Sequence, residues 1–124
     1  MIGELIDFIF GVLKTVWGTV RKFFVRVFSY CRFIVDYFSA SKRSSRYRDP
    51  SVLAAAVKVR LDAGAFNTVS CLNLSPDQYH VVTCFYDKST GEVVDAEDIQ
   101  YVCADELDAE TENKFDGKNL LILN

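Results

Sequence analysis

The chain has 124 residues, of which half are hydrophobic and a quarter are charged. That length and composition fit one small folded domain with at most one appended element, and they exclude a disordered chain, a collagen and a disulfide-rich miniprotein. The formal net charge of −3 averages two unlike halves, because residues 1–49 carry nine basic and four acidic side chains whereas residues 50–124 carry five basic and thirteen acidic ones.

Residues 2–38 predict one long amphipathic helix, because they contain no proline and their charges gather on one side of a helical wheel. The charged side chains fall within an arc of about 140°, opposite an apolar and aromatic arc of about 180°. That apolar arc is wider than the stripe by which a helix usually packs on its own core. We therefore expect part of it to contact lipid, further copies of the chain or a protein partner.

Three arrangements of this helix are open. In the first it lies in the plane of a membrane, with aromatic side chains inserted and basic ones on anionic headgroups. In the second it stands upright in an oligomeric pore or channel with its polar face inward, because residues 5–20 are too few and too charged to span alone. In the third it is buried in the bundle of a soluble scaffold, as the 3-4-3-4 apolar spacing of residues 6–34 also indicates. The predicted membrane-binding residues are Phe10, Trp17, Phe24, Phe28, Lys42, Arg43, Arg46 and Arg48.

The polar face of the predicted helix carries small and charged residues spaced by threes and fours. Each interior glycine costs about 1 kcal/mol in a helix, and close approach of a second helix would explain that cost. We therefore expect a homo-oligomer. The predicted self-association residues are Gly3, Asp7, Gly11, Lys14, Gly18, Arg21 and Lys22.

The predicted domain organisation is a membrane or assembly helix over residues 1–40, a basic, serine-rich linker over 41–50 and an acidic α+β domain over 51–124. In that domain, alternating apolar residues predict strands at 54–61, 66–74 and 79–86, the last joined through Gly91 to a strand at 92–94. A short apolar stretch at 99–103, a helix at 106–115 capped by Asp105, and a last strand at 119–123, apolar enough to be central, follow. The expected fold class is α+β, with a long N-terminal amphipathic helix followed by a small, mostly antiparallel β-sheet domain with one short helix.

No residue pattern predicts catalysis, a cofactor or a metal. The single histidine, His80, is expected at the surface or half-buried, and Cys84 lies about 13 Å further along the same strand, too far for a Cys–His pair. The cysteines lack the short spacing of metal sites and predict reduced, buried thiols. The acidic residues near position 97 lack the calcium-loop pattern. We expect a protein that is not an enzyme.

The sequence thus predicts a non-enzymatic, membrane-associated protein that self-assembles through its N-terminal helix and presents an acidic domain to the cytosol. Glu4 and Asp7 do not fit the basic start of a secretory signal, so we expect a cytoplasmic location, peripheral or integral to the cytoplasmic face of a membrane. The expected partners are an anionic lipid surface and copies of the chain, with a protein partner for the acidic domain as a further option. Nucleic acid is not expected, because the basic linker adjoins a domain of net charge −8.

Overall fold

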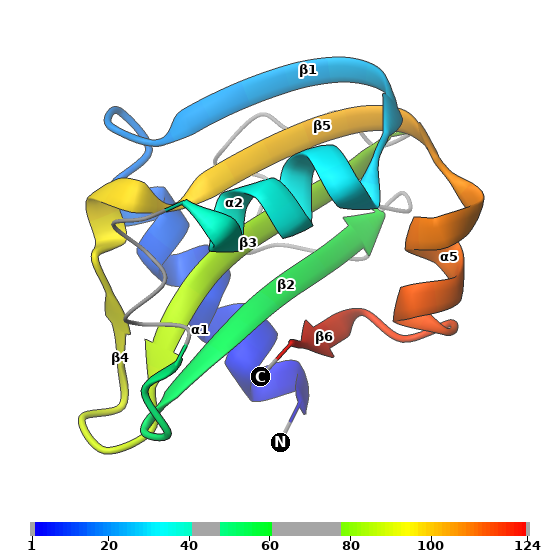
Figure 1. Cartoon of the computed structure of the whole chain (residues 1–124). Coiled ribbons are helices and arrows are strands. Elements are labelled where there is room, and N and C mark those ends of the chain that lie inside the picture. The colour runs from blue at the N-terminus through cyan, green and yellow to red at the C-terminus, as the bar shows by residue number, and fades with distance from the viewer. Residues whose placement is uncertain (1, 41–47, 61–77, 124) are drawn as a thin grey trace.

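Six strands form one mixed sheet with helices on both of its faces (Figure 1). The computed structural model describes residues 2–40, 48–60 and 78–123. In chain order the elements are α1 (Ile2–Thr15), β1 (Arg21–Phe28), the π-helical turn η1 (Cys31–Val35), α2 (Asp36–Ser39), β2 (Val52–Arg60), β3 (Tyr79–Asp87), β4 (Glu92–Val94), the 3-10 turn η2 (Ala96–Asp98), β5 (Gln100–Leu107), α5 (Ala109–Phe115) and β6 (Leu120–Ile122).

The strand order is β1-β5-β3-β2-β6, with β4 paired to β3 outside that row. Only the β1–β5 pair among these is parallel, and it runs from Arg21 opposite Gln100 to Phe28 opposite Leu107. The other pairs are antiparallel. The first quarter of the chain therefore contributes a strand to the same sheet as residues 52–122.

The prediction of one long N-terminal helix is wrong. α1 ends at Thr15, and residues 21–28 form β1 instead of further helical turns. The physical reason is local preference: seven of the ten residues from 19 to 28 are β-branched or aromatic, and such side chains lose rotamer freedom in a helix but pack well on a pleated sheet. The expected fold class is corrected accordingly, to a mainly β-sheet α+β fold with short helices.

The two faces of the sheet carry separate cores, because side chains along each strand alternate between them. On the α1 face, Ile9 and Leu13 of α1 pack in one cluster with Val82. On the α2 face, Phe38 of α2 packs in a second cluster with Phe85. Figure 1 shows α1 behind the sheet and α2 in front of it.

The strand predictions for the C-terminal part are largely confirmed. β3 and the β3–β4 hairpin lie where the alternation places them, with Gly91 in the turn at a φ of 72°. β2 begins two residues earlier than expected, and β5 extends four residues further. The expected strand at 66–74 and most of the expected linker, residues 41–47, lie outside the described residues.

Two details of the C-terminal prediction need correction. α5 begins at Ala109 and is capped by Asp108, not by Asp105, because the Asp108 carboxylate accepts a hydrogen bond from the backbone N–H of Thr111 at 2.8 Å. The last strand, β6, lies at the end of the sheet order and not at its centre. Its three residues pair only with β2.

Candidate functional site

The strand β1 forms one end of the sheet and is the first candidate site. Its inner side pairs with β5 from Arg21 to Phe28, although Arg26 has no partner in the register. No other strand in the described part of the chain pairs with its outer side. An unpaired strand edge of this length presents a row of backbone donors and acceptors, which a further strand can use.

The side chains of β1 are apolar and basic, and several are exposed. Phe24 is 72% exposed and Val27 is 42% exposed. The strand carries Arg21, Lys22 and Arg26 but no acidic residue. The strand thus leaves the apolar surface of Phe24 and Val27 accessible beside basic side chains.

Phe24 belongs to an aromatic cluster on the α1 face, together with Trp17 and Tyr101. The ring of Tyr101 lies 6.4 Å from that of Phe24 and 5.1 Å from that of Trp17, in both cases edge to face. The Lys22 ammonium lies 4.7 Å from the Trp17 ring and donates a hydrogen bond to the Trp17 carbonyl. These contacts fix Phe24 on a rigid base, although most of its own ring remains accessible.

The predicted membrane-binding residues are spread over the molecule. Phe10 is buried in the core of the α1 face and Phe28 in that of the α2 face. Trp17 is half-buried, whereas Phe24 and Arg48 are exposed. The others, Lys42, Arg43 and Arg46, lie outside the described residues.

The predicted self-association residues fall on three segments. Gly3, Asp7, Gly11 and Lys14 lie on α1, Gly18 lies in the turn after it, and Arg21 and Lys22 lie on β1. A Cβ atom added at Gly11 or Gly18 would meet nothing within 4 Å. Contacts within the described chain therefore do not require a glycine at either position.

A set of hydrogen bonds on the α1 face, which runs from buried His80 to the surface at Asp105, was missed by the sequence reasoning. His80 is fully buried, contrary to expectation, and its Nδ1 lies 2.6 Å from the hydroxyl of Tyr101. The Cys103 thiol donates to Oε1 of Gln78 at 3.1 Å, and Nε2 of Gln78 donates to the exposed carboxylate of Asp105 at 2.7 Å. The alternation of residues 101, 103 and 105 could have shown that they share one face of a strand. The register that places His80 opposite Cys103 could not be read from the sequence.

The pKa values of Tyr101 and Cys103 favour a structural role for these hydrogen-bonded groups. Burial raises the pKa of the Tyr101 hydroxyl well above its ordinary range. Burial also raises the pKa of the Cys103 thiol. Because a thiolate is the reactive form of cysteine, Cys103 is poorly suited to act as a nucleophile, even though it lies opposite His80.

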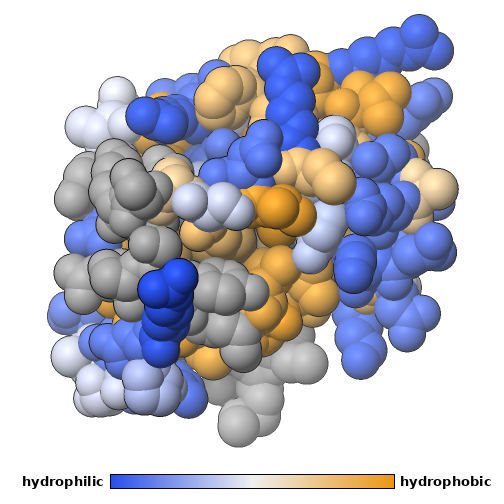
Figure 2. Space-filling view, in the orientation of Figure 1, coloured by the Kyte–Doolittle hydropathy of each residue, from blue (hydrophilic) through white to orange (hydrophobic). Residues whose placement is uncertain are grey.

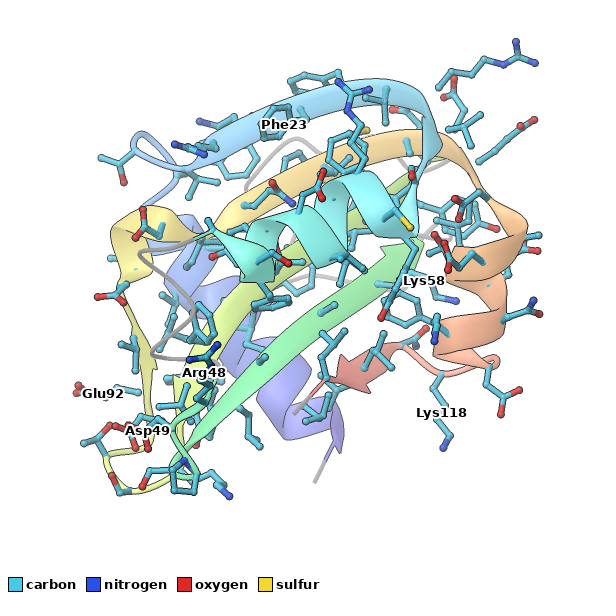
Figure 3. The ribbon with its side chains drawn as sticks, in the orientation of Figure 1. Phe23, Arg48, Asp49, Lys58, Glu92 and Lys118 are labelled. Carbon is cyan, nitrogen blue, oxygen red and sulfur yellow. The ribbon has the colours of Figure 1, made fainter. Side chains whose placement is uncertain are left out.

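A cavity of 490 Å³ opens on the α2 face and is the second candidate site. Figure 2 shows hydrophobic surface below α2 in this region, and Figure 3 shows Arg48 reaching from the chain just before β2 toward α2. The part of the wall that described residues form is mostly apolar or aromatic and includes one guanidinium group. The side chains that line it include Tyr30, Ile34, Phe38, Ser39, Arg48 and Leu123.

Neither a metal cluster nor a membrane-spanning helix is found in the described ranges. No group of three or more His, Cys, Asp or Glu residues within residues 2–40, 48–60 and 78–123 could hold a metal ion. Within the same ranges, no helix has the length and hydropathy needed to cross a membrane. The chain matches no family model, no curated protein and no solved structure.

Proposed function

We propose that the protein is a non-catalytic binding domain that accepts an extended segment of a partner protein as a new strand beside β1. The observation that carries the proposal is the outer side of β1, which is eight residues long and pairs with no described strand. Addition of a strand to an exposed sheet edge is a common mode of peptide recognition, in which backbone hydrogen bonds supply affinity and alternate side chains supply specificity.

The charge of β1 indicates what kind of segment would bind. Three basic residues and no acidic one stand on this strand, so acidic side chains on the added strand would be attracted and basic ones repelled. Pairing with the β1 strand of a second copy would bring three more basic residues onto the adjacent strand. We therefore propose an acidic segment of a different protein as the partner.

Phe24 supplies the specificity. Its ring and that of Tyr101 lie on the α1 face, beside the row of side chains that an added strand would place there. Because side chains alternate along a strand, the favoured segment has apolar residues in one row and acidic residues in the other.

The test uses a labelled ten-residue peptide that alternates valine and glutamate, with binding followed by fluorescence anisotropy. We expect Phe24→Ser and Arg26→Glu each to weaken binding about tenfold, which corresponds to about 1.4 kcal/mol. Lys118→Glu is the matched control for the charge change, because Lys118 is exposed just before β6, at the opposite end of the strand order from β1 (Figure 3), and it should leave affinity within about twofold.

A second peptide separates strand addition from simple charge attraction. N-methylation at every residue removes all backbone donors of the peptide without changing its charge, so it should abolish binding if the peptide adds as a strand. Equal binding of the methylated and unmethylated peptides would refute the proposal.

Attachment to an anionic membrane surface, which the sequence predicts, is a second candidate function for the same strand. It is favoured by the exposure of Phe24 between Arg21 and Arg26, since an aromatic side chain flanked by basic ones is suited to the headgroup region. The test is flotation of the chain with vesicles of phosphatidylcholine and phosphatidylserine. Flotation that disappears in Phe24→Ser and in pure phosphatidylcholine would support this candidate, and a chain that stays at the bottom of the gradient with both lipids would exclude it.

A further inference from the structure

The cavity on the α2 face is lined by chemically different residues, an apolar helical row and one guanidinium group. Tyr30, Ile34 and Phe38 are spaced by four residues and so follow one side of the helical segment η1–α2. Across the cavity, Leu123 is held against β2 by a backbone hydrogen bond from its N–H to the carbonyl of Ala54 at 2.9 Å.

The only charged residue among the described lining residues is Arg48. Figure 3 places Arg48 on the side of the sheet where α2 ends at Ser39. The Ser39 hydroxyl donates its proton to the carbonyl of Val35 at 2.7 Å. Among the described lining residues, the guanidinium of Arg48 is therefore the principal donor for a ligand at this end of the cavity.

The remaining wall offers packing but little polar recognition. Ile34 is fully buried and Phe38 is 5% exposed, so the cavity floor is fixed by the core of the α2 face. The Tyr30 ring already faces the ammonium of Lys114 at 5.5 Å. A ligand with many hydroxyl or amide groups would leave them without partners here, at a cost in binding free energy.

We propose that this cavity binds a free, single-chain fatty carboxylate, with the carboxylate on Arg48 and the hydrocarbon chain along Ile34, Phe38 and Leu123. A planar guanidinium pairs with a carboxylate through two parallel hydrogen bonds. The volume of 490 Å³ lies in the range of small-molecule sites, which are mostly apolar with a few polar groups that fix orientation. This proposal is independent of the strand-addition function of β1.

The experiment is calorimetric titration of the full chain with decanoate below its micelle concentration, and with decanol as the uncharged ligand of equal length. We expect one decanoate per chain and at least tenfold tighter binding of decanoate than of decanol. Arg48→Gln should reduce the affinity for decanoate to that for decanol. Arg32→Gln is the matched control, because Arg32 is also exposed but does not line the cavity, and it should change neither affinity.

A second pair of variants tests the apolar wall. Val35 lines the cavity and is 40% exposed, whereas Val27 is 42% exposed on β1. Val35→Asp should weaken both ligands at least fivefold and Val27→Asp should weaken neither, with thermal melting used to show that both variants are folded.

Three results would overturn the proposal. They are equal affinities for decanoate and decanol, equal losses in Arg48→Gln and Arg32→Gln, and no binding of either ligand. Arg48-dependent flotation with phosphatidylserine vesicles in the absence of decanoate binding would also overturn it, because the anion recognised would then belong to a bilayer and not to a free amphiphile.

Discussion

The two faces of the sheet are built from the same strands, but different kinds of side chain form the core on each face. The α1 face contains the hydrogen-bonded pair His80 and Tyr101 and the thiols of Cys84 and Cys103. The α2 face is dominated by aromatic rings, including Phe85, whose centroid lies 5.1 Å from that of Phe38. The α1 face therefore depends on keeping buried ionisable groups neutral. The α2 face combines ring packing with one buried amide, because Nε2 of Gln100 donates a hydrogen bond to the carbonyl of Phe33 at 2.7 Å.

The largest effect is expected from loss of a ring on the α2 face. Phe85→Ala should lower the free energy of unfolding by about 4 kcal/mol, because Phe85 is 1% exposed and its removal leaves a cavity. Leu13→Ala is the corresponding deletion on the α1 face and should cost about 3 kcal/mol. Urea denaturation measures both, and a loss below about 1 kcal/mol for Phe85→Ala would show that the α2 face is not a packed core.

A pair of tyrosine variants compares hydrogen bonding on the two faces. Tyr101→Phe removes the hydroxyl that contacts Nδ1 of buried His80 on the α1 face and should cost about 2 kcal/mol. Tyr37→Phe removes a bond to the carbonyl of Asp98 at 2.6 Å and should cost about 1 kcal/mol, since Asp98 is only half-buried and water can replace the hydroxyl. Denaturation midpoints give the difference, and the reverse ranking would contradict the polar character assigned to the α1 face.

The pH dependence of stability should also distinguish the faces. Burial raises the pKa of the Cys84 thiol from 9.0 to about 12. The folded state therefore holds this proton more tightly than the unfolded state, so the contribution is complete below pH 9 and is lost as the pH rises from 9 toward 12. At pH 10 the loss from this group is about 1.4 kcal/mol relative to pH 8.

The control for this pH effect is the variant Cys84→Ala. It should lose less stability than the wild type between pH 8 and pH 10, whatever its stability at pH 8. Parallel pH profiles for the two chains would show that Cys84 ionises in the folded state at its ordinary pKa.

The smallest effect concerns an exposed thiol near the α2 face. The Cys31 thiol donates a hydrogen bond to the Glu110 carboxylate at 3.2 Å, and this bond, with the negative charge of Glu110, raises the pKa of the thiol. Glu110→Gln should therefore speed alkylation of Cys31 at pH 8 a few-fold, as measured by mass spectrometry of the Cys31 peptide, because more of the thiol is ionised. Cys84 should stay unmodified in both chains, since it is 1% exposed.

The sequence predicts the β3–β4 hairpin well because its information is local. Apolar alternation through β3 and a turn that ends in Gly91 specify both strands and their connection. The N-terminal prediction fails because the charges at Arg21, Lys22 and Arg26 fit a helical stripe as well as an exposed strand. The partner that decides between them, β5, lies far along the chain.

The candidate sites show the same division. Phe24 and Arg48 were among the predicted binding residues, and both side chains are exposed. Their surroundings depend on contacts between distant segments, such as Tyr101 beside Phe24, which composition and periodicity do not reveal. The partner of His80 was missed for the same reason, because it lies on another strand.

The parallel pairing of β1 with β5 also constrains how the chain folds during synthesis. Arg21 pairs with Gln100, so β1 leaves the ribosome 79 residues before its partner. Synthesis adds about 5–20 residues per second. The segment that forms β1 is therefore synthesised roughly 4–16 seconds before the segment that forms β5. Pairings between segments so distant in sequence form slowly, and during that interval β1 is open to chaperones and to other nascent chains.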